Sequence, residues 1–155
     1  MKSKLDQTDI KILDILQENG RITIKALADL LDLSTTPVFE RVKKMEREGI
    51  ISKYAALVDQ KKIDKKLTVF VSVSLKNHTR SYLESFVNEM RQYSEVQECY
   101  HIAGDFDFMI KVVMHDMEDY ESFLLTKLSV ISNIGHVKSS FVLSRNKYST
   151  AYNIG

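Results

Sequence analysis

The first fifty residues carry apolar side chains at helical spacing, in three short runs. The first run is expected to form a helix that begins with Asp6 as its N-cap and ends at Asn19, because aspartate favours helix starts and an Asn-Gly pair favours helix ends. A second helix is predicted after Thr23, and only residues 32–34 separate it from a third. Two short helices joined by so tight a turn must cross steeply, which predicts a helix-turn-helix over about residues 24–43. We expect the second helix to bury three leucines: Leu27, Leu30 and Leu31.

The pattern changes from helical to alternating after Gly49, where the third helix is expected to end. Residues 50–59 alternate enough to form a strand or a small wing. The segment QKKIDKK at 60–66 is polar and charged, and the apolar period differs on its two sides, which is typical of a domain boundary. We therefore divide the chain into an N-terminal domain at 1–60 and a second domain at 61–155.

The second domain alternates strand and helix patterns. The strand patterns cover residues 67–76, 96–103, 107–114 and 136–145. One helix face is formed by Leu83, Phe86, Val87 and Met90, and another, after Asp116, by Met117, Tyr120, Leu124 and Leu128. The order βαββαβ implies a four-stranded antiparallel sheet with both helices on one face, which is the ferredoxin-like plait. The fold class predicted for the whole chain is therefore α+β.

One predicted strand is apolar on both sides, since it reads FMIKVVM at 108–114. Phe70 and Val142 add apolar groups on other strands, so one face of the sheet would expose a sizeable patch in a monomer. This pattern predicts a homodimer or a higher oligomer that forms through the sheet. The alternative is a sheet face that the wing or the C-terminal tail covers.

The composition makes no metal or disulfide necessary. A chain of 155 residues buries a core without such links, and its one cysteine, Cys99, cannot pair within the chain and suits a reducing compartment. The start MKSKLDQTDIK has no apolar run of signal-peptide length, and no segment approaches the roughly 18 apolar residues of a membrane span. We expect a cytoplasmic protein with no membrane partner.

Charge is distributed unevenly, although the net charge is only +1. Residues 1–60 hold ten basic and ten acidic side chains, 61–66 hold four and one, 67–135 hold five and ten, and 136–155 hold three and none. Contact with an anionic polymer must therefore come from a local patch and not from the field of the whole molecule.

The third helix, within LSTTPVFERVKKMEREG at 33–49, offers such a patch. At about 100° per residue, Val38, Val42 and Met45 share one face, which we expect to be buried. The opposite face carries hydroxyl, acidic and basic groups, and the first turn offers hydroxyls and backbone N–H groups that can bind a phosphate. A helix of this kind suits the major groove of double-stranded DNA. The expected DNA-binding residues are Ser34, Thr35, Thr36, Phe39, Glu40, Lys43, Lys44 and Arg47.

The alternative for this helix is an ordinary solvated surface, because Glu40, Glu46 and Glu48 dilute its positive charge. The short turn before it favours the DNA-binding interpretation.

The motif GDFDF places Gly104, Asp105 and Asp107 at a hairpin. Glycine and aspartate are common turn formers, so the motif can be a turn and nothing more. It can also be a small-ligand site, in which Asp107 accepts a hydrogen bond from an ammonium group while backbone N–H groups near Gly104 meet a carboxylate. The four histidines show no metal-ligand spacing, and no nucleophile or phosphate-loop motif is present, so we expect no catalytic residue and no metal site.

Two motifs in the right order carry a resemblance to a known family. The segments LDxxDxxIL, NGRI, LA and LSTTPVFERVKKMEREGII, followed by AGDFDF, resemble the Lrp/AsnC family of bacterial and archaeal transcription regulators over nearly the whole chain. The resemblance implies a winged helix-turn-helix joined by a hinge to a plait that forms dimers through its sheets, and such dimers often assemble further into octamers.

The resemblance also implies an amino-acid effector, which in this family lies at the interface between dimers, and no cofactor. The effector-binding residues implied by it are Ile102, Gly104, Asp105, Asp107, Met117, Ser139 and Ser140. The last strand has Val137 and Ser139 where the family commonly alternates two threonines, and Ser132-Asn133 where it commonly has Pro-Gly. These departures leave the identity of the effector open.

The leading hypothesis is a sequence-specific DNA-binding transcription regulator whose assembly or DNA affinity responds to a small amino acid. Two alternatives stay open. One is a small ferredoxin-like enzyme with an accessory helical domain, and the other is a constitutive architectural DNA binder with no effector.

Overall fold

A computed structural model of the chain describes residues 5–155. They form two compact units, of which the first contains residues up to 57 together with 146–155, and the second contains 58–145. The sequence-based division lies just beyond residue 57 and counts 146–155 with the second domain.

The first unit contains three helices, α1 (Gln7–Glu18), α2 (Ile24–Leu31) and α3 (Thr35–Arg47). Asp6 caps α1, because its side chain accepts the backbone N–H of Asp9 while the Asp9 side chain accepts the N–H of Asp6. The Thr23 side chain caps α2 in the predicted place. The three-residue turn between α2 and α3 confirms the helix-turn-helix.

The core of this unit lies where the three helices meet. Its buried side chains are Ile12, Leu13, Leu27, Ala28, Val38, Val42 and Met45. Leu30 was expected among them, but 66% of it is exposed. Leu27, Ala28 and Leu31 share one face of α2 at about 100° per residue, and Leu30 falls outside this face.

Of the strand or small wing predicted at 50–59, the strand is wrong for the described chain. Residues 52–59 form no strand and lead into the short 3₁₀ helix η1 (Gln60–Ile63). Three large apolar side chains of this segment, Tyr54, Leu57 and Val58, are exposed. Within residues 5–155, the sheet contains only β1 to β4, and this segment pairs with none of them.

The C-terminal tail, residues 146–155, packs on the first unit. The Gln17 side chain brackets the backbone of Tyr152: its Nε2 donates to the Tyr152 carbonyl at 3.1 Å, and its Oε1 accepts the Tyr152 N–H at 2.7 Å. Ile154 packs against the helical core. The chain therefore passes between the two units twice, once at 57–58 and once at 145–146.

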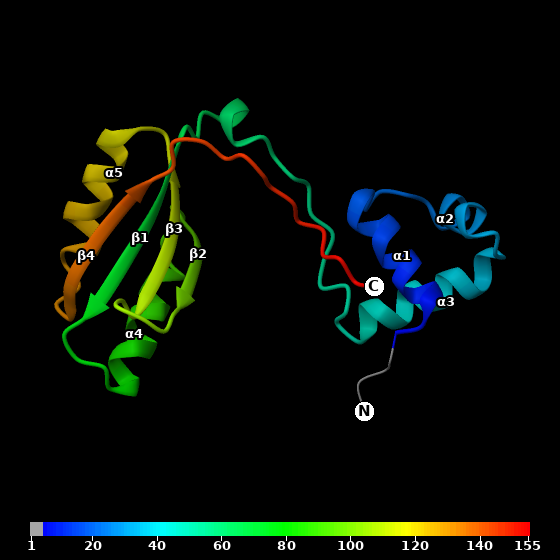
Figure 1. Cartoon of the computed structure of the whole chain (residues 1–155), viewed down its shortest axis with the longest axis horizontal. Helices are drawn as coiled ribbons and strands as arrows, with labels where there is room; N and C mark the ends of the chain where they lie inside the picture. The colour runs from blue at the N-terminus through cyan, green and yellow to red at the C-terminus, as the bar shows by residue number, and fades with distance from the viewer. Residues whose placement is uncertain (1–4) are drawn as a thin grey trace. The chain divides into compact units, whose positions relative to one another are not determined.

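The second unit is the predicted plait. Its elements are β1 (Leu67–Leu75), α4 (Arg80–Met90), β2 (Val96–His101), β3 (Phe108–Met114), α5 (Met117–Phe123), the π-helical turn η2 (Leu124–Leu128) and β4 (Ile134–Phe141). The antiparallel sheet has the order β2-β3-β1-β4, and both long helices pack on one of its faces (Figure 1). The expected βαββαβ fold is confirmed.

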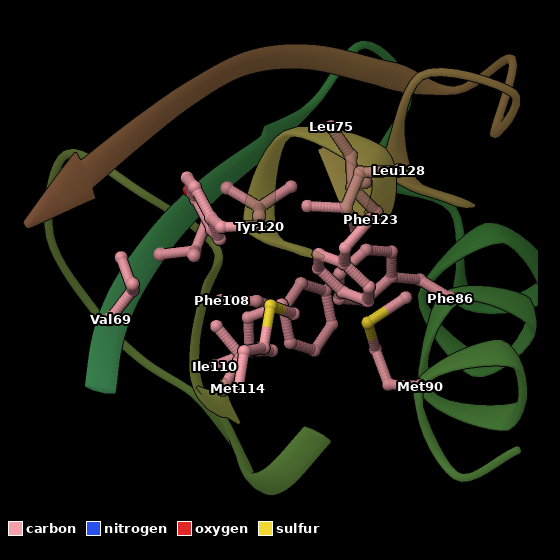
Figure 2. Close-up of a cluster of buried hydrophobic side chains, with 13 residues drawn as sticks. Val69, Leu75, Phe86, Met90, Phe108, Ile110, Met114, Tyr120, Phe123 and Leu128 are labelled. Atoms are coloured by element: carbon pink, nitrogen blue, oxygen red, sulfur yellow. The ribbon is translucent and has the colours of Figure 1, made fainter. Parts of the chain in front are cut away.

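The core of the plait lies between the sheet and these helices. Alternate residues of β1, Val69, Val71 and Val73, point into it. Figure 2 shows Val69 there, together with Phe86 and Met90 of α4. The second predicted helix face is only partly right, because Met117 is 55% exposed whereas Tyr120, Phe123 and Leu128 are buried. The turn η2 changes the helical period after Phe123, which brings both Phe123 and Leu128 onto the core.

The other face of the sheet is mixed in character. The register places Phe70 opposite Lys111 and Ser72 opposite Met109 on this face, while Phe108 turns to the core. The Lys111 Nζ lies 2.6 Å from a Glu98 carboxylate oxygen. Apolar Phe70 and Met109 thus flank a charged pair on the face that was expected to expose a sizeable apolar patch.

Candidate DNA-binding and effector sites

The outer face of α3 is arranged as its sequence pattern predicts. Val38, Val42 and Met45 are buried, which turns the opposite side of the helix outward. The residues exposed along α3 and its N-cap are Ser34, Thr35, Thr36, Phe39, Glu40, Lys43 and Arg47, and Lys44 is half-buried.

The N-terminus of α3 has no side-chain cap. Ser34 occupies the N-cap position with extended backbone, but its hydroxyl makes no capping hydrogen bond, and no acidic side chain lies in the first turn. The first N–H groups of a helix have no partners within the helix, and together with the helix dipole they favour an anion. This end of α3 is therefore suited to a phosphate.

Lys43 is held along the helix by its neighbours. Its Nζ lies 2.7 Å from a Glu46 carboxylate oxygen and 5.8 Å from the centre of the Phe39 ring. The lysine lowers the pKa of the Glu46 carboxyl through this hydrogen bond, and Tyr54 adds a second one. Arg47, in contrast, takes part in no ion pair with the described chain, so its guanidinium is available for an external partner.

Arg41, which sequence reasoning missed, fixes the position of α3. Its Nη1 lies 2.6 Å from a carboxylate oxygen of Asp6 and 2.7 Å from one of Asp9, both at the start of α1. These partners are more than thirty residues away in the sequence, so no local sequence pattern indicates the pairing. The charged network links α3 to the first helix of the unit.

This network makes the first unit sensitive to acid. The N–H of Asp9, followed by Arg41, lowers the pKa of the Asp6 carboxyl. A depressed folded-state pKa contributes stability above the unfolded value of about 3.9, and this contribution is lost as the pH falls through the lower folded value. We expect the melting temperature of the first unit to fall between pH 6 and pH 3 by a smaller amount in Asp6→Asn than in the parent.

Calorimetric melts of the full chain at several pH values measure this difference. Asp14→Asn, on the exposed side of the same helix, is the matched control and should keep the parent's pH dependence. Equal pH dependence in Asp6→Asn and the parent would contradict the assigned role of Asp6.

The turn between β2 and β3 carries Gly104, Asp105 and Asp107, as expected. Gly104 has a φ of 143°, which side chains rarely adopt, so this position favours glycine. The Ile102 N–H donates to the Asp107 carbonyl at 2.9 Å and closes the turn. The turn thus brings four of the expected effector residues together.

The Asp107 carboxylate makes hydrogen bonds that hold the turn in place. Its Oδ2 accepts the Leu75 N–H at 2.7 Å and lies 3.0 Å from the His78 Nε2, which fastens the turn to the end of β1. His78 is a second residue that the sequence did not reveal, because it lies in the connection after β1. One carboxylate oxygen of Asp107 is left for a ligand.

Met117 and Ser139 line a pocket of about 680 Å³ between α5 and β4. Ser139 pairs with Val71 in the middle of β1, whereas Phe108, at the end of the turn, pairs with Val73. The residues that line the pocket are Met117, Glu118, Tyr120, Glu121, Leu124, Ser139 and Phe141. The Ser139 hydroxyl is hydrogen-bonded to the buried Tyr120 hydroxyl, and burial raises the pKa of this phenol. Ser140, one residue on, pairs with Phe70 and so faces the opposite side of the sheet.

The expected effector residues therefore form two groups in a single chain. Strand β3 separates the turn that ends at Phe108 from the start of α5 at Met117, and its length of seven residues corresponds to roughly 20 Å. One small amino acid cannot span the distance between the turn and Met117 of the same subunit, and Ser139 lies between these two ends of the sheet.

Two negative findings concern other kinds of site. The described residues hold no group of three or more His, Cys, Asp or Glu side chains with metal-binding geometry. Among the helices within 5–155, none has the length and apolar character required to cross a membrane.

Comparison with known proteins identifies both units. A family model described as Lrp/AsnC ligand binding domain matches residues 68–152, and one described as winged helix-turn-helix DNA-binding matches residues 5–52. The chain is 37% identical over 141 residues to the Bkd operon transcriptional regulator of Pseudomonas aeruginosa, covering 91% of this chain and 92% of that protein. It is 34% identical over 145 residues to the leucine-responsive regulatory protein of Escherichia coli, covering 94% and 88%.

Solved structures agree. A transcriptional regulator of Neisseria meningitidis in complex with L-methionine superposes with a TM-score of 0.92 at 35% identity and covers 97% of both chains. The AsnC protein of Escherichia coli gives a TM-score of 0.89 at 26% identity, covering 96% of this chain and 99% of that one.

The chain belongs to the Lrp/AsnC family of transcription regulators and combines its helix-turn-helix with its ligand-binding domain. The resemblance inferred from the two sequence motifs is thereby confirmed.

Proposed function

We propose that this regulator reads DNA with the outer face of α3 and that a small amino acid tunes its assembly or its DNA affinity. The proposal that α3 binds DNA rests on one observation: Val38, Val42 and Met45 are buried along one side of the helix. The hydroxyl and basic side chains of α3 are therefore exposed together on the opposite side. A helix of this length fits the major groove.

The residues of α3 divide into two roles in this proposal. Lys43, Lys44 and Arg47 contact phosphates, as does the uncapped first turn near Ser34. Base edges are contacted by Thr35, Thr36, Glu40 and Lys43, with Phe39 supporting Lys43 from below. Chromosomal DNA as the partner also supports the expected location in the cytoplasm.

The effector proposal combines the two residue groups of the plait. The match to a ligand-binding family and the methionine bound to the Neisseria regulator support an amino acid as the ligand class. Since the turn and Met117 lie at opposite ends of β3, we place the effector where the α5–β4 pocket of one subunit meets the GDFDF turn of another. An effector bound there would link assembly to ligand concentration.

The last part of the proposal is a homodimer that assembles into larger oligomers. The two subunits meet through the open sheet face, which is the side of the sheet that α4 and α5 do not cover. Phe70 and Met109 supply apolar surface on this face. The tail belongs to the first unit, which argues against the alternative of a sheet covered by the tail.

Calorimetric titration of the full chain with the common amino acids, paired with DNA gel shifts, tests the effector proposal. We expect at least one amino acid to bind and to change DNA affinity, and Asp107→Ala to abolish this response while basal DNA binding is kept. Because Asp107 also holds Leu75 and His78, Asp105→Ala is the second variant, as the Asp105 carboxylate makes no such bonds within the described chain. Glu84→Ala on the exposed side of α4 is the control and should respond like the parent.

The outcomes separate the alternatives. A chain that binds DNA but no amino acid would be a constitutive architectural binder. A chain that ignores DNA would favour the plait enzyme. An unchanged amino-acid response in both turn variants would remove the GDFDF turn from the effector site.

A further inference from the structure

The α5–β4 pocket has walls of two kinds. Met117, Leu124 and Phe141 form an apolar side, where Phe141 meets the Tyr120 ring edge-to-face at a centroid distance of 5.3 Å. Glu118 and Glu121 form the charged side. Among the described residues, no lysine, arginine or histidine lines the pocket. A ligand in this pocket therefore meets aliphatic, aromatic and anionic groups but no cation.

The two glutamates have no partners within the described chain. Neither carboxylate takes part in a hydrogen bond or an ion pair with the described residues. Their acidic neighbours differ, because Asp116 caps α5 and Asp119 accepts the His115 N–H. Glu118 lies in the first turn, where the helix dipole favours a negative charge, but Glu121 lies beyond that turn and has no such structural use.

The start of α5 carries charge of the same sign, because Asp116, Glu118, Asp119 and Glu121 lie within six residues of one another. Lys66 interacts with Asp116 but does not line the pocket. At the proposed subunit contact, the GDFDF turn would add Asp105 and Asp107. A net-positive ligand is attracted to such a site, whereas the carboxylate of a zwitterion gains nothing from this wall.

The polar floor of the pocket favours a donor as well. The Tyr120 and Ser139 hydroxyls are bonded to each other, and Tyr120 belongs to the buried cluster (Figure 2). Burial disfavours the phenolate, so the floor is neutral and presents hydroxyl oxygens and an aromatic edge. Aromatic rings and carboxylates together are the usual surroundings of a bound organic cation.

We infer that the pocket takes a small organic cation with an aliphatic stem, of the class of basic amino acids and aliphatic amines, and not a zwitterion with an apolar side chain. The stem packs along Met117, Leu124 and Phe141, and the ammonium group lies against Glu121 and Glu118. This inference rests on the proposed effector function and specifies its ligand class.

Calorimetry of the full chain with lysine and norleucine tests the inference, because the two amino acids share a backbone and a carbon stem and differ by the side-chain ammonium. Cadaverine, which lacks the carboxylate, tells whether the amine alone suffices. We expect lysine or cadaverine to bind at least tenfold more tightly than norleucine. Glu121→Gln should remove this preference and Glu118→Gln should reduce it, while Glu84→Gln on α4 should keep it.

Equal or tighter binding of norleucine, or a cation preference that survives Glu121→Gln, would overturn the inference. If an apolar amino acid binds and changes DNA affinity, the proposed effector function stands and only the ligand class is wrong. If no amino acid and no amine binds, both the effector proposal and this inference fail.

Discussion

Replacing Arg47 by alanine is expected to weaken DNA binding at least tenfold, which corresponds to about 1.4 kcal/mol. Arg47 is exposed on the outer face of α3 and makes no ion pair with the described chain, so its charge is free to neutralise a phosphate. Lys43→Ala should have a smaller effect, because Lys43 must give up part of its 2.7 Å contact with Glu46 when it binds DNA. Each phosphate contact that is lost should reduce the slope of log K against log salt by about 0.9.

Gel shifts or anisotropy titrations at two or more salt concentrations measure both quantities. Lys11→Ala, which removes an exposed lysine from α1 of the same unit, is the matched control and should leave affinity and slope close to the parent values. If Arg47→Ala and Lys43→Ala bind DNA like the parent, α3 is not the reading helix.

The second large effect is expected on assembly. Met109→Lys places a charge on the open sheet face beside Lys111, whose position opposite Phe70 marks the middle of that face. If this face joins two subunits, the substitution should raise the dimer dissociation constant about 30-fold or more, equivalent to roughly 2 kcal/mol. DNA affinity should fall with it, because a dimer binds two half-sites at once.

Light scattering and sedimentation at micromolar concentration measure the association. Ser85→Lys adds the same charge on α4, an exposed position among the helices that cover the opposite face, and should leave association unchanged. A parent protein that is monomeric, or a Met109→Lys variant that associates like the parent, would contradict a dimer through this face.

In the helical unit, local sequence patterns predicted most of the structure but not the burial of every residue. The caps at Asp6 and Thr23, the short turn and the buried stripe of α3 are all local features, since each depends on residues within a turn or two of one another. They were predictable for that reason. Leu30 was misplaced, because an eight-residue helix packed from one side leaves part of its apolar surface exposed, and the packing direction depends on the other helices.

In the plait, too, local patterns predicted the elements but not all of their contacts. Alternation in β1 and the βαββαβ order predicted the sheet and its helix layer. The period change at η2 was not visible in the pattern, so Phe123 was missing from the predicted helix face. Met117 was predicted on that face, but it is the first residue of α5 and is exposed at the pocket. The family resemblance named residues for the effector site, but it could not show that the turn residues and Met117 lie at opposite ends of β3 in one chain.

The sequence by itself determined the two-module α+β organisation, the face of α3 that points outward and the family, because these depend on periodicity and on contiguous motifs. The tertiary structure decided what depends on distant contacts. Arg41 meets Asp6 and Asp9, the tail bonds to Gln17 from 135 residues away, His78 reaches the GDFDF turn, and the two glutamates of α5 gather with Phe141 in one pocket. Such contacts form only when chain folding closes long loops, and no local preference encodes which residues then meet.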